Sequence, residues 1–230
     1  MPVARRIACT VAGVTDHGQN VYTVDLLPVS PVPRFKPGQF LHLALDPYEP
    51  GGFWPESRVF SIASSPLTRD RLSITYAVKG AFTGRMEREL CVGTDVWVKL
   101  PYGEFVVDPS PDTVLFAGGT GVTAFTAFLQ ALVPGRASRV VLFYGARTPE
   151  LLIYAPLVEE RSRAVASFSY ELVPESTHGL LDVGAAWPAV AGLDAPEFYL
   201  SGPPQMLTAL TAQLLDRGVS PRAVHTDAWD

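Results

Sequence analysis

Two glycine-containing turns in the second half of the chain have the residue types that bind phosphate. One follows an apolar stretch and consists of Gly118, Gly119, Thr120 and Gly121. The other follows a later apolar stretch and opens a helical pattern with Ser201, Gly202 and Pro203. Glycine lets a backbone approach its ligand closely, and the free N–H groups at a helix start attract anions. Because ligands of parallel sheets lie where strands end and helices begin, the two turns together fit one dinucleotide.

Each turn also has a simpler interpretation as an ordinary strand-to-helix connection without a ligand. The first is not a Walker loop, because no Gly-Lys-Ser/Thr follows it, and it lacks the GxGxxG spacing. Taken separately, neither turn establishes that a ligand binds there.

A short alternating segment in the first half has residues that suit another part of a nucleotide. It consists of Arg58, Val59, Phe60 and Ser61. A guanidinium suits a pyrophosphate through two hydrogen bonds, and an aromatic ring suits stacking on a flat heterocycle. Alternation predicts that Arg58 and Phe60 point to one side and Ser61 to the other, unless the strand ends at this point. A surface arginine beside a core phenylalanine is the structural alternative.

The segment just before a predicted helix offers a second anion site in the same half. It consists of Gly80, Ala81, Phe82 and Thr83. The helix N–H groups and the threonine hydroxyl could hold a phosphate there, or Thr83 could serve as a helix cap and nothing more.

The elements that must position these residues differ between the two halves. Short β-rich pieces between turns rich in Pro, Gly and Asp predict strands over residues 7–14, 21–27, 39–45, 58–61, 72–78 and 95–100. One helical stretch, 84–90, intervenes. Six short strands with one helix predict a small closed or Greek-key antiparallel barrel.

The second half alternates strand and helix patterns. We expect strands over 113–117, 139–144, 165–173, 197–201 and 224–228, and helices over 121–133, 149–161 (broken) and 203–217. Repeated strand–helix units predict a parallel sheet covered on both faces. The Pro- and Asp-rich junction 106–113 is the natural boundary, so we expect two domains, 1–107 and 108–230.

Composition and charge exclude several classes of function. The 230 residues include 18 Lys+Arg and 23 Asp+Glu, a formal charge of −5, and no basic run, so we expect no nucleic-acid partner. Cys9 and Cys91 cannot supply the four thiolates of an iron–sulfur cluster, and four histidines show no metal-ligand spacing, so we expect no metal. No apolar run approaches the roughly 18 residues of a bilayer span. We expect a soluble, cytoplasmic protein, since two cysteines suit a reducing compartment.

Taken in order, these segments resemble the ferredoxin–NADP reductase superfamily, whose members join an antiparallel FAD barrel to a nicotinamide-binding α/β domain. The resemblance covers nearly the whole chain. It rests on residues 58–61 for the Arg-x-Tyr-Ser motif, 80–83 for the Gly-x-x-Ser/Thr turn and 101–105 for the end of the barrel. It rests also on the nucleotide turns at 118–123 and 201–206.

The resemblance implies roles for the residues of the first half. Arg58 pairs with the flavin pyrophosphate, Phe60 packs on the isoalloxazine and the Ser61 hydroxyl reaches flavin N5. Thr83 and the amides after Gly80 hold the pyrophosphate. The remaining FAD-binding residues that it implies are Tyr76, Val78 and Phe82.

For the second half, the resemblance implies a nicotinamide dinucleotide site. Residues 118–123, with Thr123 at their end, hold the pyrophosphate, and Gly202 and Pro203 belong to the same site. Ser201 lies near the nicotinamide during hydride transfer. Arg147 is a candidate partner for a 2′-phosphate, whereas Glu175 on a later loop favours NADH over NADPH.

Three departures from the family pattern bear on these roles. Phe60 keeps the stacking ring of the usual Tyr but loses its hydroxyl, and Ser201 stands where many members have Cys. Trp229 lies one residue from the end, where plant-type members end in Tyr. The resemblance implies that Trp229 shields the flavin face, and packing on the barrel is the alternative.

The resemblance therefore implies an FAD-dependent oxidoreductase that takes electrons from NADH or NADPH. Because the cysteine count leaves no fused iron–sulfur domain, we expect a separate acceptor: a small redox protein such as a ferredoxin or flavodoxin, an oxygenase component, or a quinone or free flavin. Two alternatives are a non-catalytic flavin- or dinucleotide-binding subunit of a redox complex and a dinucleotide-binding regulator. Oligomeric state stays open.

Overall fold

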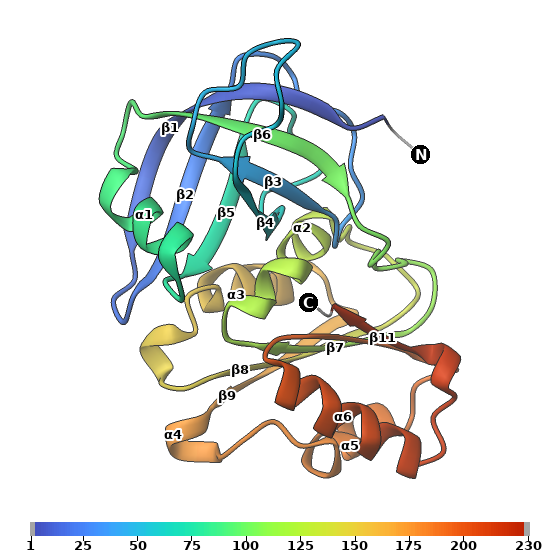
Figure 1. Cartoon of the computed structure of the whole chain (residues 1–230). Helices are drawn as coiled ribbons and strands as arrows, with labels where there is room; N and C mark the ends of the chain where they lie inside the picture. The colour runs from blue at the N-terminus through green and yellow to red at the C-terminus, as the bar shows by residue number, and fades with distance from the viewer. Residues whose placement is uncertain (1–2, 228–230) are drawn as a thin grey trace. The chain divides into compact units, whose positions relative to one another are not determined.

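The structure, a computed structural model, describes residues 3–227 (Figure 1). It divides into two compact units, Met1–Val106 and Val107–Asp230. Among the described residues, no helix has the length and apolar character that a bilayer crossing requires. Trp229, the predicted flavin shield, lies outside the described residues.

The first unit is an antiparallel sheet whose strands follow the spatial order β4-β3-β6-β1-β2-β5, as predicted for a barrel-like fold. Its strands are β1 (Arg5–Asp16), β2 (Val21–Pro28), β3 (Phe40–Ala44), β4 (Ser57–Ser61), β5 (Leu72–Ala77) and β6 (Asp95–Tyr102). Alternation builds the core, as in β6, where buried Val96, Val98 and Leu100 flank half-exposed residues.

The two edge strands of this sheet, β4 and β5, run beside each other, and we call them the seam. They are not neighbours in the hydrogen-bonded ladder. At one end they are joined by a backbone bond of 2.8 Å from Ala63 N–H to the Ser73 carbonyl. Each edge strand therefore has backbone N–H and C=O groups, and side chains beside them, that make no hydrogen bonds within the sheet.

Helix α1 (Ala81–Glu89) begins three residues before the predicted start at residue 84. Thr83, the third residue of the helix, caps its start from within. The Thr83 hydroxyl accepts hydrogen bonds from the N–H groups of Lys79 (2.9 Å) and Gly80 (3.1 Å). Glycine is a poor helix former, and Gly84 weakens the helical pattern at the N-terminal end of this helix. For this reason the sequence predicts a helix that begins too late in the chain.

The second unit is a five-stranded parallel sheet of order β11-β10-β7-β8-β9, which confirms the predicted α/β class. Its strands are β7 (Thr113–Gly118), β8 (Val140–Ala146), β9 (Phe168–Pro174), β10 (Glu197–Ser201) and β11 (Val224–Asp227). The helices are α2 (Thr123–Ala131), α3 (Ala155–Ala164), α4 (Glu175–His178), α5 (Val183–Val190) and α6 (Pro204–Asp216), with short 3-10 turns η1 (Gly119–Val122), η2 (Pro149–Leu151) and η3 (Pro221–Ala223).

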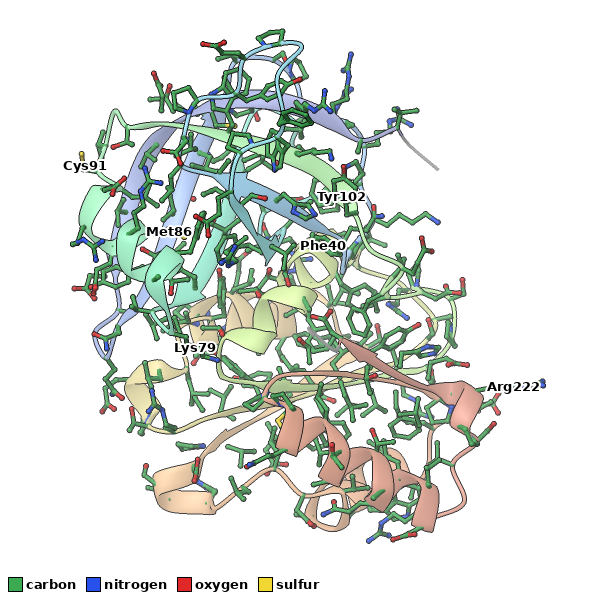
Figure 2. The ribbon with its side chains drawn as sticks, in the orientation of Figure 1. Phe40, Lys79, Met86, Cys91, Tyr102 and Arg222 are labelled. Atoms are coloured by element: carbon green, nitrogen blue, oxygen red, sulfur yellow. The ribbon has the colours of Figure 1, made fainter. Side chains whose placement is uncertain are left out.

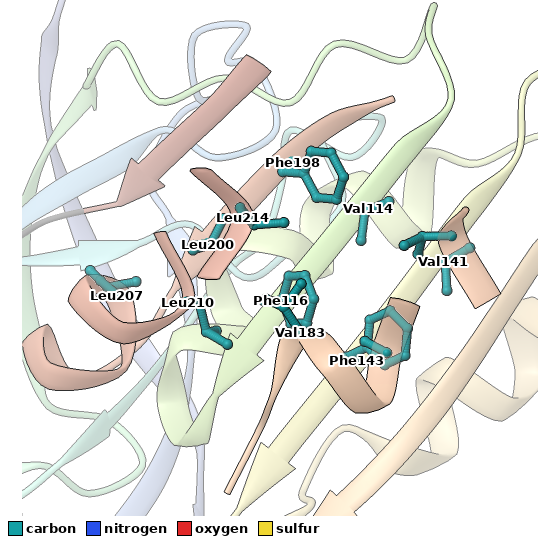
Figure 3. Close-up of a cluster of buried hydrophobic side chains, with 12 residues drawn as sticks. Val114, Phe116, Val141, Phe143, Val183, Phe198, Leu200, Leu207, Leu210 and Leu214 are labelled. Carbon is teal, nitrogen blue, oxygen red and sulfur yellow. The ribbon is translucent and has the colours of Figure 1, made fainter. Parts of the chain in front are cut away.

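Helices cover both faces of this sheet. Figure 1 shows α2 and α3 on one face and α5 and α6 on the other. On the second face, strand side chains such as Phe116 and Phe143, stacked at 5.0 Å between ring centroids, pack against Leu210 of α6 and Val183 of α5 (Figure 3). Burial on both faces explains why these strands are continuous apolar runs in the sequence.

Helix α5 has no counterpart in the sequence prediction. It contains Gly184 and Pro188, both poor helix formers. The Asp182 side chain caps it by accepting a hydrogen bond of 3.0 Å from the Ala185 N–H. Packing of Val183, Ala186 and Val190 onto the sheet therefore outweighs a weak local preference.

Candidate functional site

In the first unit, the start of α1 and Arg58 of β4 together form a positively charged site. The Arg58 guanidinium lies over the Phe82 ring, with 5.2 Å between Cζ and the ring centroid. Phe82 is the second residue of α1, so the guanidinium lies beside the helix N-terminus, whose first turn has no acidic residue. Lys79 comes just before the same turn (Figure 2). Helix dipole and guanidinium both favour an anion here.

The Thr83 hydroxyl shapes this turn. Besides accepting from the two backbone amides of residues 79 and 80, it donates to the Gly80 carbonyl at 3.2 Å. The amides of Ala81 and Phe82 belong to the first helical turn, which has no intrahelical partners for its N–H groups. These amides, more than the Thr83 hydroxyl, are the donors that the turn offers to a ligand.

Between Arg58 and the end of β4, the seam is lined by aromatic rings and hydroxyls. Phe60 contacts Tyr76 of β5 edge to face, at 6.1 Å between centroids, and Tyr76 stacks on Tyr22 at 5.6 Å. Ser61 is 9% exposed, and its hydroxyl has no partner among residues 3–227. Val78 holds the strand end through its N–H, which donates to the Asn20 carbonyl at 2.9 Å.

This set of groups fits a flavin dinucleotide. An anion site, an aromatic ring and an unpartnered, nearly buried hydroxyl follow one another along β4 and match a pyrophosphate, a flat heterocycle and a polar ring atom. Strand alternation within β4 could not predict that Tyr76 and Phe82 lie beside these residues, because both belong to other elements.

In the second unit, the two predicted glycine turns lie directly against each other at the carboxyl ends of β7 and β10. A Cβ on Gly121 would meet the Ser201 carbonyl and the Gly202 N, the latter at 2.7 Å. A Cβ on Gly202 would meet Met206 Cε at 2.6 Å. Gly119 has a φ of +54° and no atom within 4 Å of its Cβ position, so its outer side is open. Contact between the turns is therefore one physical reason for these glycines.

The serine of the second turn is held by a residue that the sequence analysis missed. The Ser201 hydroxyl donates a hydrogen bond of 3.0 Å to the Asp227 carboxylate, and both side chains are buried. Asp227 is the direct register partner of Ser201 on the neighbouring parallel strand. The sequence did contain a signal for this pair. Ser201 and Asp227 both lie near the carboxyl ends of predicted strands, 197–201 and 224–228, and the carboxyl ends of parallel strands meet at the same edge of the sheet.

Two further predicted residues lie at the same edge of the sheet. Thr123 is buried and donates its hydroxyl hydrogen to the Thr120 carbonyl at 2.8 Å, so it stabilises the first turn. Arg147 follows β8 and is exposed, and its carbonyl accepts a hydrogen bond of 3.1 Å from the Ser176 N–H of α4. The charged side chains of Arg147 and Glu175 therefore belong to adjacent turns. Pro203 precedes α6 as its N-cap.

Metal ligands do not gather in the part of the chain that the structure describes, where no group of three His, Cys, Asp or Glu residues is placed to hold an ion. Cys9 is buried and Cys91 is exposed, and both are free.

Comparisons with known proteins find similar sequences among oxidoreductases. Residues 115–211 match the family described as oxidoreductase NAD-binding domain. The chain is 32% identical over 217 residues to the reductase component of a phenol 2-monooxygenase from Pseudomonas sp. (strain CF600), covering 86% of this chain and 58% of that one. It is 30% identical over 212 residues to the ferredoxin reductase component of a 3-ketosteroid-9-alpha-monooxygenase from Mycolicibacterium smegmatis, covering 85% and 56%.

A solved structure has a similar fold. A cytochrome P450 reductase from Amycolatopsis superposes with a TM-score of 0.84 at 24% identity, covering 99% of this chain and 70% of that one. The chain spans little more than half the length of the curated relatives that it matches.

Proposed function

We propose that the chain is a member of the ferredoxin–NADP reductase superfamily and an FAD-dependent oxidoreductase that moves electrons from a reduced nicotinamide dinucleotide to a separate acceptor. The observation that carries the proposal is the anion site of Arg58 and α1, followed along the seam by Phe60 and the free Ser61 hydroxyl. A fold that bound only one dinucleotide in its second unit would leave these groups unused.

The residues of the first unit would hold FAD. Arg58 and the first amides of α1 neutralise its pyrophosphate, and Phe60 packs on its ring system. Ser61 places a hydroxyl beside the ring without having to break another hydrogen bond. When bound, FAD supplies a two-electron acceptor that can release electrons one at a time.

The second unit would hold the nicotinamide dinucleotide at the two glycine turns. Gly119 leaves the backbone open to a phosphate. Because the Ser201 hydroxyl donates to Asp227, its oxygen remains an acceptor for a ligand N–H. Glu175 beside Arg147 repels a 2′-phosphate, which favours NADH over NADPH.

We propose a redox protein as the acceptor. The relatives in the comparisons are reductase components, named for a phenol 2-monooxygenase and a 3-ketosteroid-9-alpha-monooxygenase. By analogy, an oxygenase component or a ferredoxin would receive the electrons here, in the cytoplasm, where two free thiols such as those of Cys9 and Cys91 persist.

The test is anaerobic absorbance of the purified protein reconstituted with FAD. We expect the flavin band at about 450 nm to bleach on addition of NADH, and more slowly with NADPH. A protein that stays colourless after FAD is added would overturn the proposal. A yellow protein that neither nucleotide bleaches would instead indicate a non-catalytic flavin-binding subunit.

A further inference from the structure

The seam contains a buried phenol whose hydroxyl has no partner. Tyr76 is 3% exposed, and its hydroxyl makes no hydrogen bond within residues 3–227. Three other buried tyrosines all use their hydroxyl groups in hydrogen bonds. Tyr48 accepts from Arg6 (2.8 Å), Tyr144 donates to the Leu151 carbonyl (3.3 Å) and Tyr199 accepts from the Asp108 N–H (3.1 Å). Among these four buried tyrosines, Tyr76 alone has no hydrogen-bond partner within residues 3–227, so its hydroxyl is available to a ligand.

The Tyr76 hydroxyl is open to a ligand. Among the described residues, the fully enclosed polar atoms without a partner belong to Ser64, Arg136 and Arg161, so the Tyr76 oxygen retains some contact with solvent space. Its ring contacts two neighbouring rings, Tyr22 in a stacked arrangement and Phe60 edge to face. The phenol is thus fixed in place with its polar end accessible.

The position of Tyr76 specifies the part of the ligand that it can reach. It lies across the seam from Phe60, which stands on β4 between Arg58 and Ser61. In the proposed function, Arg58 holds the pyrophosphate and Ser61 lies at the flavin ring. The segment that joins these two parts of FAD is the ribityl chain with its phosphate, and it carries oxygens only as polar atoms.

We propose that the Tyr76 hydroxyl donates a hydrogen bond to an oxygen of the ribityl phosphate segment of FAD. The inference rests on the proposed function, because it takes FAD as the ligand of the seam. Tyr76 acts in binding and orientation, and it makes no contact with a reacting atom.

The protonation state of Tyr76 suits a donor. Burial, with smaller contributions from Tyr22 and the Glu87 carboxylate, raises the pKa of the Tyr76 phenol to about 12. The phenol therefore keeps its proton at neutral pH and can donate it to a phosphate or ribityl oxygen.

The test compares Tyr76→Phe with Tyr22→Phe. Both variants remove one phenol oxygen from the same stacked pair, but the Tyr22 hydroxyl already donates to Glu87 at 2.8 Å. We expect Tyr76→Phe to weaken FAD binding by roughly ten-fold or more, as for a lost bond to a charged or strongly polar acceptor. We expect Tyr22→Phe to stay within about two-fold of the wild type, with flavin fluorescence titration of apoprotein as the measurement.

Thermal unfolding of the apoproteins separates a ligand role from a structural one. Loss of an unpartnered hydroxyl leaves the apoprotein as stable as the wild type or slightly more stable. The expected pattern for Tyr76→Phe is therefore an unchanged or higher apoprotein Tm with weaker FAD binding. Equal FAD affinity of Tyr76→Phe and wild type would overturn the inference, as would a lower Tm that accounts for the weaker binding.

Titration with smaller flavins identifies the oxygen. If Tyr76→Phe weakens both riboflavin and FMN, the phenol reaches a ribityl hydroxyl, and if it weakens only FMN and FAD, it reaches the phosphate. Both results support the inference, whereas a loss confined to FAD would place Tyr76 at the adenosine end and overturn it. If the wild type itself binds no FAD, the proposed function fails instead.

Discussion

At the scale of single residues, the anion site depends on the Arg58 guanidinium. Its side chain is half exposed and pairs with Glu56 at 3.1 Å, an exposed contact that contributes little to stability. The Phe82 ring beneath it sets its position beside α1. Arginine rather than lysine suits this place, since a planar guanidinium can bind two phosphate oxygens at once.

We therefore expect Arg58→Ala to weaken FAD binding by roughly 10- to 100-fold with little change in apoprotein stability. Arg58→Lys should recover part of the loss, because an ammonium keeps the charge but not the paired hydrogen bonds. Flavin fluorescence titration gives both affinities. Wild-type affinity in the alanine variant would remove Arg58 from the site.

The buried Ser201–Asp227 pair is a second feature at this scale. Asp227→Ala removes the acceptor of the Ser201 hydroxyl, and we expect a loss of about 1–3 kcal/mol in the free energy of unfolding. A double-mutant cycle with Ser201→Ala, followed by urea unfolding, isolates the pair energy. Strictly additive losses would show that the two side chains are energetically independent.

At the scale of elements, the two glycine turns act as one structure. Each turn ends a strand of the parallel sheet, and the backbone of one fills the space where a Cβ of the other would lie. The spacing between the turns is therefore set by residues that have no side chain. A ligand across these strand ends meets a preformed surface.

A matched pair of substitutions tests this contact. Gly121→Ala places a methyl group on the Ser201 carbonyl and should lower both the free energy of unfolding, by about 1–3 kcal/mol, and the affinity for NADH. Gly119→Ala meets no atom within 4 Å but adopts a φ of +54°, so it should cost about 1 kcal/mol. Urea unfolding compares them, and equal losses would contradict the role of turn contact.

At the scale of the whole molecule, the two cysteines differ in how folding changes their exposure to solvent. Cys9 is buried on β1, and burial raises the pKa of its thiol to about 12. Cys91 is exposed just after α1 (Figure 2). Reactivity requires a thiolate that solvent can reach, so only one of the two is available while the chain is folded.

Alkylation of the native protein at pH 8 should therefore modify Cys91 alone, and unfolding in urea should expose the second thiol, as mass spectrometry can count. Because the folded pKa of Cys9 lies above its ordinary value of 9.0, stability should fall as pH rises above about 9 and the unfolded thiol ionises. Cys9→Ala should lessen that decline between pH 9 and 10. An identical decline in both proteins would contradict the effect of burial.

The sequence by itself determined which segments alternate, which are continuously apolar and where glycine turns interrupt them. Those properties depend on neighbours a few residues away, so the antiparallel and parallel sheets and the positions of Arg58, Ser61 and both glycine turns were predictable. Helix α5 was not, because its stability comes from packing on the sheet against poor local propensity.

Only the tertiary structure decided which of these residues meet. Tyr76 contacts Phe60 because the strand order brings the edges β4 and β5 together, and Asp227 reaches Ser201 through the register of two parallel strands. The glycine turns contact each other for the same reason. Strand order and register result from pairing between segments far apart in the chain, and no local pattern of residues specifies that pairing.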